Sequence, residues 1–265
     1  MKRRSLLQTK ASARKNPYAW LHEPHGRVFN NLTLPGTPQG CKELAEITGE
    51  SLMKVAAAAG ARVAIFDGRN QWYAFHDGPV CRKHPGLGDR DLVAELIAAG
   101  KKRGVVYVPY LPMDCDLRAW EEHPDWRSVD FAGKQRPDTM PRCCEHSPFR
   151  KHLADYLRDL ASRYEIGGFW FDGFGIATSC FCPACRAGFR RAHGREAPES
   201  AEKDRDGWRL WVAYKEEESA RVLAEFIESG RSVKPGLPVC TAWVPGSRAS
   251  RLPSSASCRP IARLS

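Results

Sequence analysis

The stretch GGFWFDGFG, residues 167–175, decides how the chain is expected to fold. Its apolar residues follow one another without the polar alternation of a half-exposed strand, which predicts a strand buried on both faces. Asp172 ends the run, and Gly173 follows it and permits an unusual backbone turn. A carboxylate is therefore expected at the carboxyl end of a buried strand.

Runs of the same kind recur along the chain and alternate with helical patterns. The expected strands are 27–34, 61–66, 105–111, 167–172 and 238–243, and the expected helices are 41–60, 89–104, one opened by Ser147 and Pro148, one from about Cys182, and 207–230. Apolar strands separated by helices indicate a parallel sheet. The loops after the strands are long and hold most of the His, Asp, Cys and Trp residues, which is typical of a (β/α)8 TIM barrel. A doubly wound open sheet is the alternative, but no glycine-rich phosphate fingerprint follows the early strands.

The chain holds fewer units than a complete barrel. About five βα units can be recognised, and residues 247–265 contain no acid and no periodicity. We therefore expect a basic disordered segment at 1–20, a partial TIM-barrel catalytic domain at 21–246 and a disordered tail at 247–265. The tail is either a disordered extension or the out-of-frame end of a longer gene, and we favour the second. Missing strands would leave an exposed sheet edge that favours association into a homo-oligomer.

The charge distribution argues against a nucleic-acid partner. The formal net charge is +10, and the ten Lys and Arg residues within 1–20 and 247–265 account for it. The body between them is neutral and lacks the basic footprint of a nucleic-acid binder. No apolar run approaches the roughly 20 residues of a membrane span, so no membrane partner is expected. The paired arginines near the start lack the apolar core of an export signal, and the expectation is a cytoplasmic protein.

Three cysteines crowd together at Cys180, Cys182 and Cys185. Without an export signal, this tight C-x-C-x-x-C spacing favours metal ligation over disulfides. A structural zinc needs four ligands, so the fourth must come from elsewhere, and the Cys143–Cys144 pair is well placed. Unligated buried thiols are the alternative. A closed four-thiolate site has no position for water, so Zn²⁺ would brace the loop beside Asp172 rather than react.

Asp172 is the leading candidate for chemistry. In a barrel its carboxylate projects into the mouth, where burial beside Trp170 can tune its pKa. The simpler interpretation is a carboxylate that caps the next turn or hydrogen-bonds a neighbouring strand. Aromatic and polar residues after other strands favour a functional role, because a sugar stacks on rings and hydrogen-bonds to polar groups. The residues expected to bind a carbohydrate substrate are Trp72, His76, Tyr110 and Trp170.

Together these segments resemble the hypothetical glycosyl hydrolase 6 family. The resemblance is carried by HPGLGDRDLVAELIAAGKKRGVVYVPY (84–110), EEHPDWRSVDFAGK (121–134), CCEHSPFRKHL (143–153) and the segments around GGFWFDGFG and CFCPACRAGF. It implies a sugar-cleaving barrel. The WFDG ending is similar to that of α-L-fucosidases and implies that Asp172 is the nucleophile.

The cysteines resemble the zinc cluster of glycoside hydrolase family 42 β-galactosidases. This implies that the zinc ligands are Cys144, Cys180, Cys182 and Cys185. That family ends its fourth strand with Asp-Asn-Glu, whose Glu is the general acid, and this chain has no Glu there.

Glycoside hydrolysis usually needs a second carboxyl group. Asp114 and Asp116, after the third strand, are the nearest candidates, and Glu121 and Glu122 are further alternatives. We expect a glycosidase that hydrolyses O-glycosidic bonds through Asp172, and an incomplete copy that has lost its activity is the alternative. The competing hypothesis is a non-catalytic, zinc-braced protein that binds carbohydrate or another partner.

Overall fold

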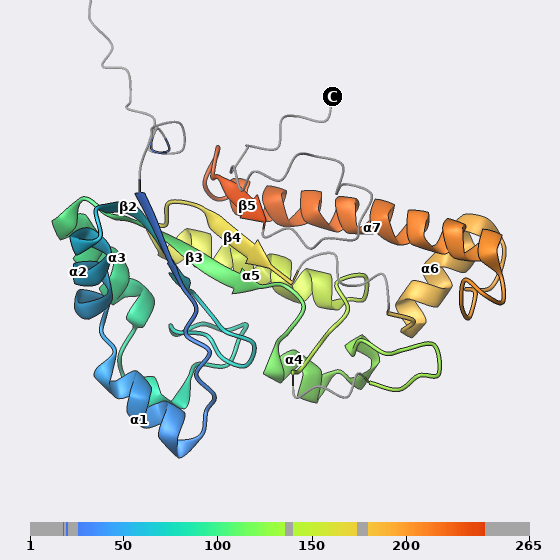
Figure 1. The fold of residues 1–265 in the computed structure, drawn as a ribbon, viewed down its shortest axis with the longest axis horizontal. Coiled ribbons are helices and arrows are strands. Elements are labelled where there is room, and N and C mark those ends of the chain that lie inside the picture. Colours follow the sequence, from blue (N-terminus) through green and yellow to red (C-terminus); the bar gives the residue numbers. More distant parts are fainter. Residues whose placement is uncertain (1–17, 19, 21–25, 136–139, 174–179, 242–265) are drawn as a thin grey trace, which may run out of the picture.

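The computed structural model describes residues 18, 20, 26–135, 140–173 and 180–241. Five strands form one parallel sheet: β1 (Gly26–Asn30), β2 (Ala61–Asp67), β3 (Val106–Pro112), β4 (Phe169–Asp172) and β5 (Val239–Thr241). They lie side by side in the order in which they occur along the chain (Figure 1). The α/β class and the parallel sheet are therefore confirmed. The tail predicted at 247–265, and 1–20 apart from Tyr18 and Trp20, lie outside the described residues.

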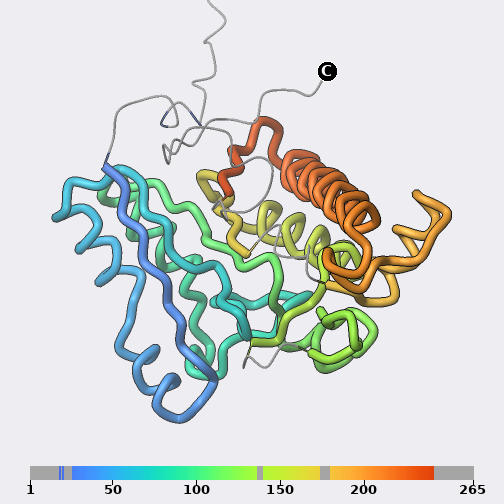
Figure 2. The backbone as a smooth tube through the Cα atoms, turned by 45° about the vertical axis from the view of Figure 1, so that its right-hand side comes forward, coloured from blue at the N-terminus to red at the C-terminus, as the bar shows by residue number. Residues whose placement is uncertain are grey.

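Helices cover one side of this sheet. The α-helices of the described residues are α1 (Pro38–Glu46), α2 (Gly49–Ala58), α3 (Leu92–Arg103), α4 (Leu117–Glu122), α5 (Phe149–Arg163), α6 (Pro183–His193) and α7 (Arg205–Arg231). The connecting helices α2, α3, α5 and α7 contribute to the same hydrophobic cluster on the sheet, and Figures 1 and 2 show them along one side of it. A doubly wound sheet has helices on both faces and a reversal of strand order. The described strands have no such reversal, and their order is that of a barrel.

One predicted helix is two helices in the structure. The pattern over 41–60 predicts a continuous helix, but the chain breaks between α1 and α2 at Thr48. Thr48 and Ser51 form a reciprocal capping box, in which each side chain accepts from the other's backbone N–H. Arg90 fills the break, because its guanidinium donates to the carbonyl oxygen of Ile47 at 2.7 Å. Local capping and a distant arginine therefore override the helical periodicity.

The strands β2, β3 and β4 are largely buried on both faces, as their apolar runs predict, whereas most residues of β1 are exposed. Phe66, Phe169 and Phe171 face the helices and belong to the main hydrophobic cluster. Ile65 and Tyr110 face the opposite side, in a smaller cluster with the half-buried Trp170. Because side chains alternate along a strand, the last residues of β2 and β4 lie on this second face. In a barrel it is the inner face.

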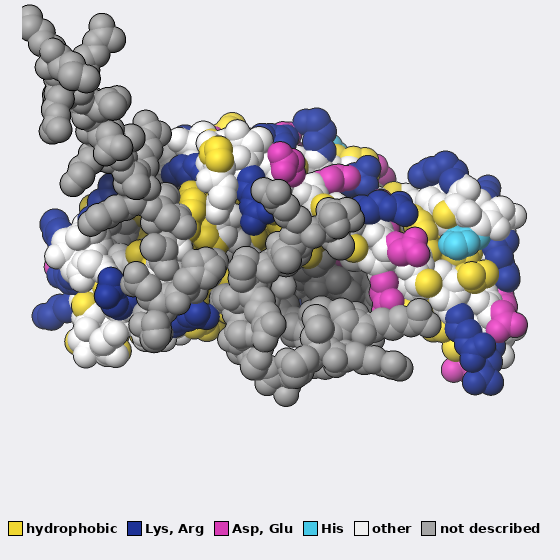
Figure 3. Space-filling model, turned by 90° about the horizontal axis from the view of Figure 1, so that it is seen from above, with side chains coloured by type: hydrophobic (Ala, Val, Ile, Leu, Met, Phe, Trp, Pro, Cys, Tyr) yellow, Lys and Arg dark blue, Asp and Glu magenta, His cyan; other side chains and the backbone are white. Residues whose placement is uncertain are grey.

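A separate cluster of buried side chains lies beyond the sheet, where α6 packs against the first turns of α7 (Figure 2). It contains Phe181, Phe189 and Trp211 around the cysteines. Its surface carries interspersed basic and acidic side chains, visible on the right of Figure 3, with ion pairs such as Arg190–Glu196. None of the described helices combines the length and the apolar character that crossing a membrane requires.

Candidate active site and metal centre

Asp172 lies at the carboxyl end of β4 and is half-buried. It is level with Pro112 on the neighbouring strand, and its carbonyl oxygen accepts from the backbone N–H of Met113 at 2.8 Å. The hydroxyl of Tyr110 donates a hydrogen bond to its carboxylate. Burial, and then the bond to Asp172, raise the pKa of Tyr110 above its ordinary value, so the phenol keeps its proton. In this hydrogen bond the Tyr110 hydroxyl is therefore the donor and the Asp172 carboxylate the acceptor.

Aromatic rings lie on the same face as Asp172. Phe29 is 53% exposed, and its ring centroid is 5.3 Å from that of Tyr110 and 6.4 Å from that of Trp170. The predicted residues Tyr110 and Trp170 therefore lie together beside Asp172. Trp72 is half-buried in the loop after β2.

Asp114 packs directly against the turn after β4. Gly173 has a φ of +69°, and a Cβ placed on it would lie 2.3 Å from the Asp114 Oδ1 atom. Glycine is required there for both reasons. Asp114 forms an ion pair with Arg142. Burial raises its pKa, and the Arg142 charge opposes that shift.

Asp67 is a third carboxyl of this face, and the sequence analysis missed it. It is the last residue of β2 and is 0% exposed. Burial raises its pKa from 3.8 to about 8, and the negative charge of Asp172 adds to the shift. The predicted strand, 61–66, ended one residue too early. A sequence signal existed, since IFDG at 65–68 repeats the WFDG of 170–173.

Asp116 does not join these carboxyls. It caps α4 by accepting from the backbone N–H of Ala119 and forms a 2.8 Å ion pair with Arg69. Burial would raise its pKa, but the nearby His152, with its Nε2 atom 3.5 Å away, and the Arg69 charge outweigh burial and hold the pKa at about 2. A carboxylate that stays ionised cannot donate a proton at neutral pH. The expectation for Asp116 is therefore corrected to a structural role.

His76 also lies away from Asp172. It is 0% exposed and lies against the outer helix α5, where its Nε2 atom is 3.0 Å from the Tyr156 hydroxyl. Its ring also packs edge-on against Tyr164, near the end of α5. The loop after β2 passes behind the sheet at this point rather than over the rim. His76 is therefore part of the packing between loop and helix.

The four cysteines that the resemblance implies do converge. The sulfur atoms of Cys144, Cys180, Cys182 and Cys185 are buried and all lie within 4.8 Å of one another. Cys144 Sγ is 3.4 Å from Cys185 Sγ, and Cys182 Sγ is 3.6 Å from it. A tetrahedral ion with metal–sulfur bonds of about 2.3 Å holds its sulfurs about 3.8 Å apart, which these spacings fit. This cluster can hold a metal ion.

Two of the cysteines, Cys182 and Cys144, lie at or just before the first residues of α6 and α5. Cys182 is the N-cap of α6, and Pro183 begins that helix. Cys144 precedes α5, and its carbonyl oxygen accepts from the Ser147 hydroxyl at 2.7 Å. The same hydroxyl accepts from the backbone N–H of Phe149, so α5 begins one residue later than the sequence predicts.

Lys215 is a cation buried against the cluster. It is 0% exposed on α7, and its Nζ atom is 2.8 Å from Cys185 Sγ. Burial alone would lower its pKa, but the negative sulfurs of Cys144 and Cys185 outweigh burial and raise it. Four thiolates around a divalent ion carry two excess negative charges, and Lys215 offsets one of them.

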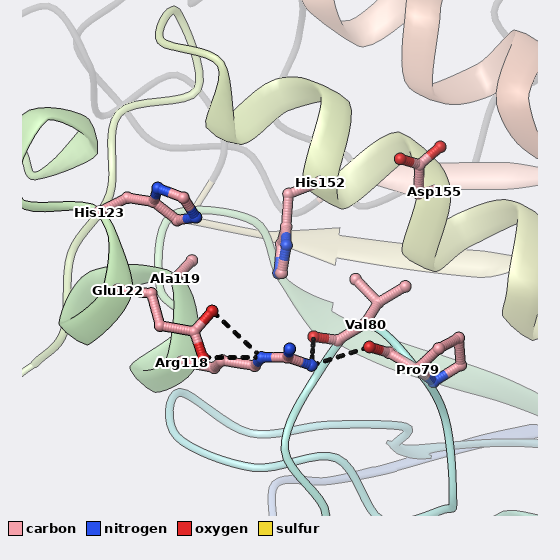
Figure 4. A pocket seen from close by; sticks show the side chains of 8 residues that line it. All are labelled: Pro79, Val80, Arg118, Ala119, Glu122, His123, His152 and Asp155. Carbon is pink, nitrogen blue, oxygen red and sulfur yellow. Dashed lines mark hydrogen bonds and ion pairs between the residues drawn. The ribbon is translucent and has the colours of Figure 1, made fainter.

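A second group of possible ligands does not fit a metal. Ligand atoms of Cys81, Asp116 and His152 lie within 4.8 Å of one another. The Arg69 guanidinium already lies among them, 2.8 Å from Asp116 and 3.6 Å from Cys81 Sγ. It occupies the place of a cation and would repel one. His152 also points into a pocket of about 260 Å³ between α4 and α5, whose lining does not include Asp172 (Figure 4).

Parallel strands in sequential order, with carboxyl groups at their carboxyl ends, are typical of barrel-type α/β proteins. Within this class, residues 48–173 match the family model described as "Hypothetical glycosyl hydrolase 6". The match supports the family that the sequence resembles and a glycoside hydrolase-like role. No curated protein matches the sequence.

Solved glycosidase structures share the fold. The α-L-fucosidase isoenzyme 2 from Paenibacillus thiaminolyticus is 19% identical with a TM-score of 0.62, over 83% of this chain and 32% of that one. The β-galactosidase from Halorubrum lacusprofundi is 15% identical with a TM-score of 0.58, over 81% and 35%. The β-galactosidase from Bacillus circulans sp. alkalophilus is 16% identical with a TM-score of 0.57, over 82% and 36%. The chain thus spans about a third of the length of these proteins.

Proposed function

We propose that this protein is a glycoside hydrolase in which Asp172 is the nucleophile. The observation that carries the proposal is the position of Asp172 at the end of β4, half-buried, hydrogen-bonded by Tyr110 and close to the carboxyl groups of Asp67 and Asp114. Cleavage of a glycosidic bond commonly uses two carboxyl groups, one to attack or stabilise the sugar and one to protonate the leaving oxygen. This rim offers three carboxyl groups, those of Asp67, Asp114 and Asp172.

The neighbouring side chains suit a sugar. The rings of Phe29, Trp170 and Tyr110 provide a surface on which the CH face of a pyranose stacks. Trp72, half-buried in the loop after β2, stays a further candidate for contact with the sugar. Asp114, ion-paired with Arg142, fixes the turn that carries Asp172 and stays a candidate for the second carboxyl group.

We further propose that the four cysteines bind one structural Zn²⁺. Four soft thiolates at tetrahedral spacing favour zinc over magnesium or calcium, which take oxygen ligands. The ion would tie the loop before α5 to the loop after β4. Its role would be to hold the surroundings of Asp172, since four protein ligands leave no position for water.

The proposed catalytic unit is the partial barrel at 21–246. A chain that spans about a third of its structural relatives can retain the site of the family without its turnover. The second candidate function is therefore a zinc-braced carbohydrate-binding protein that uses the same aromatic surface. Binding and turnover measured on one sample separate the two functions.

The test is hydrolysis of chromogenic fucosides and galactosides by the purified chain and by Asp172→Asn. Asp206→Asn is the matched control, because the Asp206 side chain is 88% exposed on α7. We expect turnover by the wild type and the control and its loss in Asp172→Asn. Turnover that survives Asp172→Asn would exclude the assignment. Binding of an iminosugar without any turnover would support the carbohydrate-binding function instead.

A further inference from the structure

Asp67 shares the face and the rim of Asp172. Val63, Ile65 and Asp67 alternate onto the inner face of β2. Asp67 is level with Tyr110 on β3, and Tyr110 is level with Trp170 on β4. Asp67 and Asp172 therefore stand at the carboxyl ends of strands on either side of β3. Tyr110 lies between them, and its hydroxyl donates a hydrogen bond to Asp172.

Only one of the two carboxyl oxygens of Asp67 is hydrogen-bonded within the described residues. Its Oδ2 atom accepts from the backbone N–H of Leu32, just after β1. Its Oδ1 atom is buried and has no hydrogen-bond partner among the described residues. Buried polar atoms are almost always paired, so an unpaired carboxyl oxygen beside a candidate nucleophile needs an explanation in function.

The two carboxyl groups differ in burial, because Asp67 is fully buried and Asp172 is half-buried. Burial and the nearby charge of Asp172 raise the pKa of Asp67 to about 8, so Asp67 carries a proton at neutral pH. Asp172 is half-buried and accepts a hydrogen bond from the Tyr110 hydroxyl. Neighbouring carboxyl groups in such different environments commonly divide the roles of acid and nucleophile.

The other carboxyl groups of the rim suit this task less well. Asp116 is held ionised by Arg69 and His152. Asp114 is ion-paired with Arg142, which would have to be broken before the group could hold and donate a proton. Asp67 has no cationic partner among its described contacts.

We propose that Asp67 is the general acid of this site, a role that rests on the proposed glycosidase function. Because the Asp67 carboxyl is itself buried, its proton passes through one bridging water to the glycosidic oxygen as the C1–O bond breaks and Asp172 bonds to C1. The leaving alcohol departs with that proton. The Asp67 carboxylate then takes a proton from water, whose oxygen attacks C1 and releases Asp172. The protein returns to its starting state with water consumed and the sugar released.

The experiment compares leaving groups. The 2,4-dinitrophenolate of a dinitrophenyl glycoside leaves without being protonated, whereas the methoxide of a methyl glycoside must be protonated as it leaves. Because general acid catalysis is worth about 10²–10⁴-fold, Asp67→Asn should lose about that factor in kcat/KM on the methyl glycoside and less than about tenfold on the dinitrophenyl glycoside. Asp172→Asn should lose activity on both, and Asp67→Glu, which keeps a proton donor, should recover part of the loss. The fall of wild-type kcat/KM above pH 8 should disappear in Asp67→Asn.

Each outcome distinguishes the two proposals. Equal losses on both substrates in Asp67→Asn, or no loss on either, would overturn the role of Asp67 while leaving Asp172 in place. A leaving-group-dependent loss in Asp114→Asn instead would transfer the role to Asp114. If the wild type cleaves neither glycoside at any pH, the proposed function fails and the assignment of Asp67 fails with it. Metal content and near-UV circular dichroism, measured on every variant, identify a loss that comes from misfolding.

Discussion

Replacing Asp67 by Asn should change how the stability of the protein depends on pH. The pKa of Asp67 is about 8 in the folded protein, against 3.8 for the ordinary side chain. The folded state therefore binds a proton that the unfolded state has lost between these two values. The stability that this proton contributes is complete below pH 4 and is lost as the pH rises through 8. An amide at position 67 does not titrate, so the variant lacks this loss.

The size of the expected change in unfolding free energy follows from the shifted pKa of Asp67. Between the two pKa values the folded state holds about one more proton, which corresponds to about 1.4 kcal/mol for each pH unit. From pH 5 to pH 7 the wild type should therefore lose about 2.7 kcal/mol of unfolding free energy relative to Asp67→Asn. Asp67 is 0% exposed, so solvent screening does not reduce this value appreciably. All other titrating groups are common to both proteins and cancel in the difference.

The assay is urea unfolding of both proteins at pH 5, 6 and 7, with Asp206→Asn as the control. The difference in unfolding free energy between Asp67→Asn and the wild type should move in favour of the variant at each step, whereas the control should show no trend. Curves for Asp67→Asn and the wild type that stay parallel from pH 5 to pH 7 would refute the reasoning. Asp67 would then be ionised in the folded protein and unable to act as an acid.

Three further predictions concern Lys215, Gly173 and Tyr110. Lys215→Met should weaken zinc binding by about 10–100-fold in competition with a chromophoric chelator, because outer-shell partners of metal ligands typically contribute that much; unchanged affinity would show that the buried ammonium does not offset the thiolates. Gly173→Ala should lower the unfolding free energy by about 2–3 kcal/mol in urea, because a Cβ there meets Asp114. Gly194 also has a positive φ, +65°, but nothing lies within 4 Å of its added Cβ, so Gly194→Ala should lower the unfolding free energy by only about 1 kcal/mol. Equal losses in the two variants would show that the Asp114 contact plays no part. Tyr110→Phe should lower kcat by about 10–100-fold, the value of a hydrogen bond to a charged group, and undiminished turnover would contradict the role of Tyr110 in holding Asp172.

The sequence predicted the strands well because buried parallel strands are unbroken apolar runs. Each of the five predicted runs overlaps a strand, and the periodicity of 207–230 lies within α7. The single helix predicted over 41–60 was wrong, because the break depends on a capping box and on Arg90, which reaches across from a segment over forty residues away. Side-chain capping and distant arginines leave no trace in hydrophobic periodicity.

The candidate site was only partly predictable. Asp172 and the cysteines stood out because each is part of a compact motif. Asp67 ends a strand in the same way as Asp172, but a boundary error of one residue hid it. His76 follows a strand as well, yet the path of its long loop takes it behind the sheet, which spacing cannot show. Lys215 lies in a helix rich in charged residues, where only the tertiary structure distinguishes a buried lysine from a solvated one.

The central claim is that Asp172 attacks the sugar, and covalent trapping tests it most directly. A 2-deoxy-2-fluoro glycosyl fluoride of a cleaved sugar forms a glycosyl-enzyme that hydrolyses slowly, so peptide mass spectrometry can locate the label. The account predicts one label per chain, on the peptide that contains Asp172, and none in Asp172→Asn. Rapid turnover of the parent glycoside with the label on another carboxylate, or with no label at all, would contradict it.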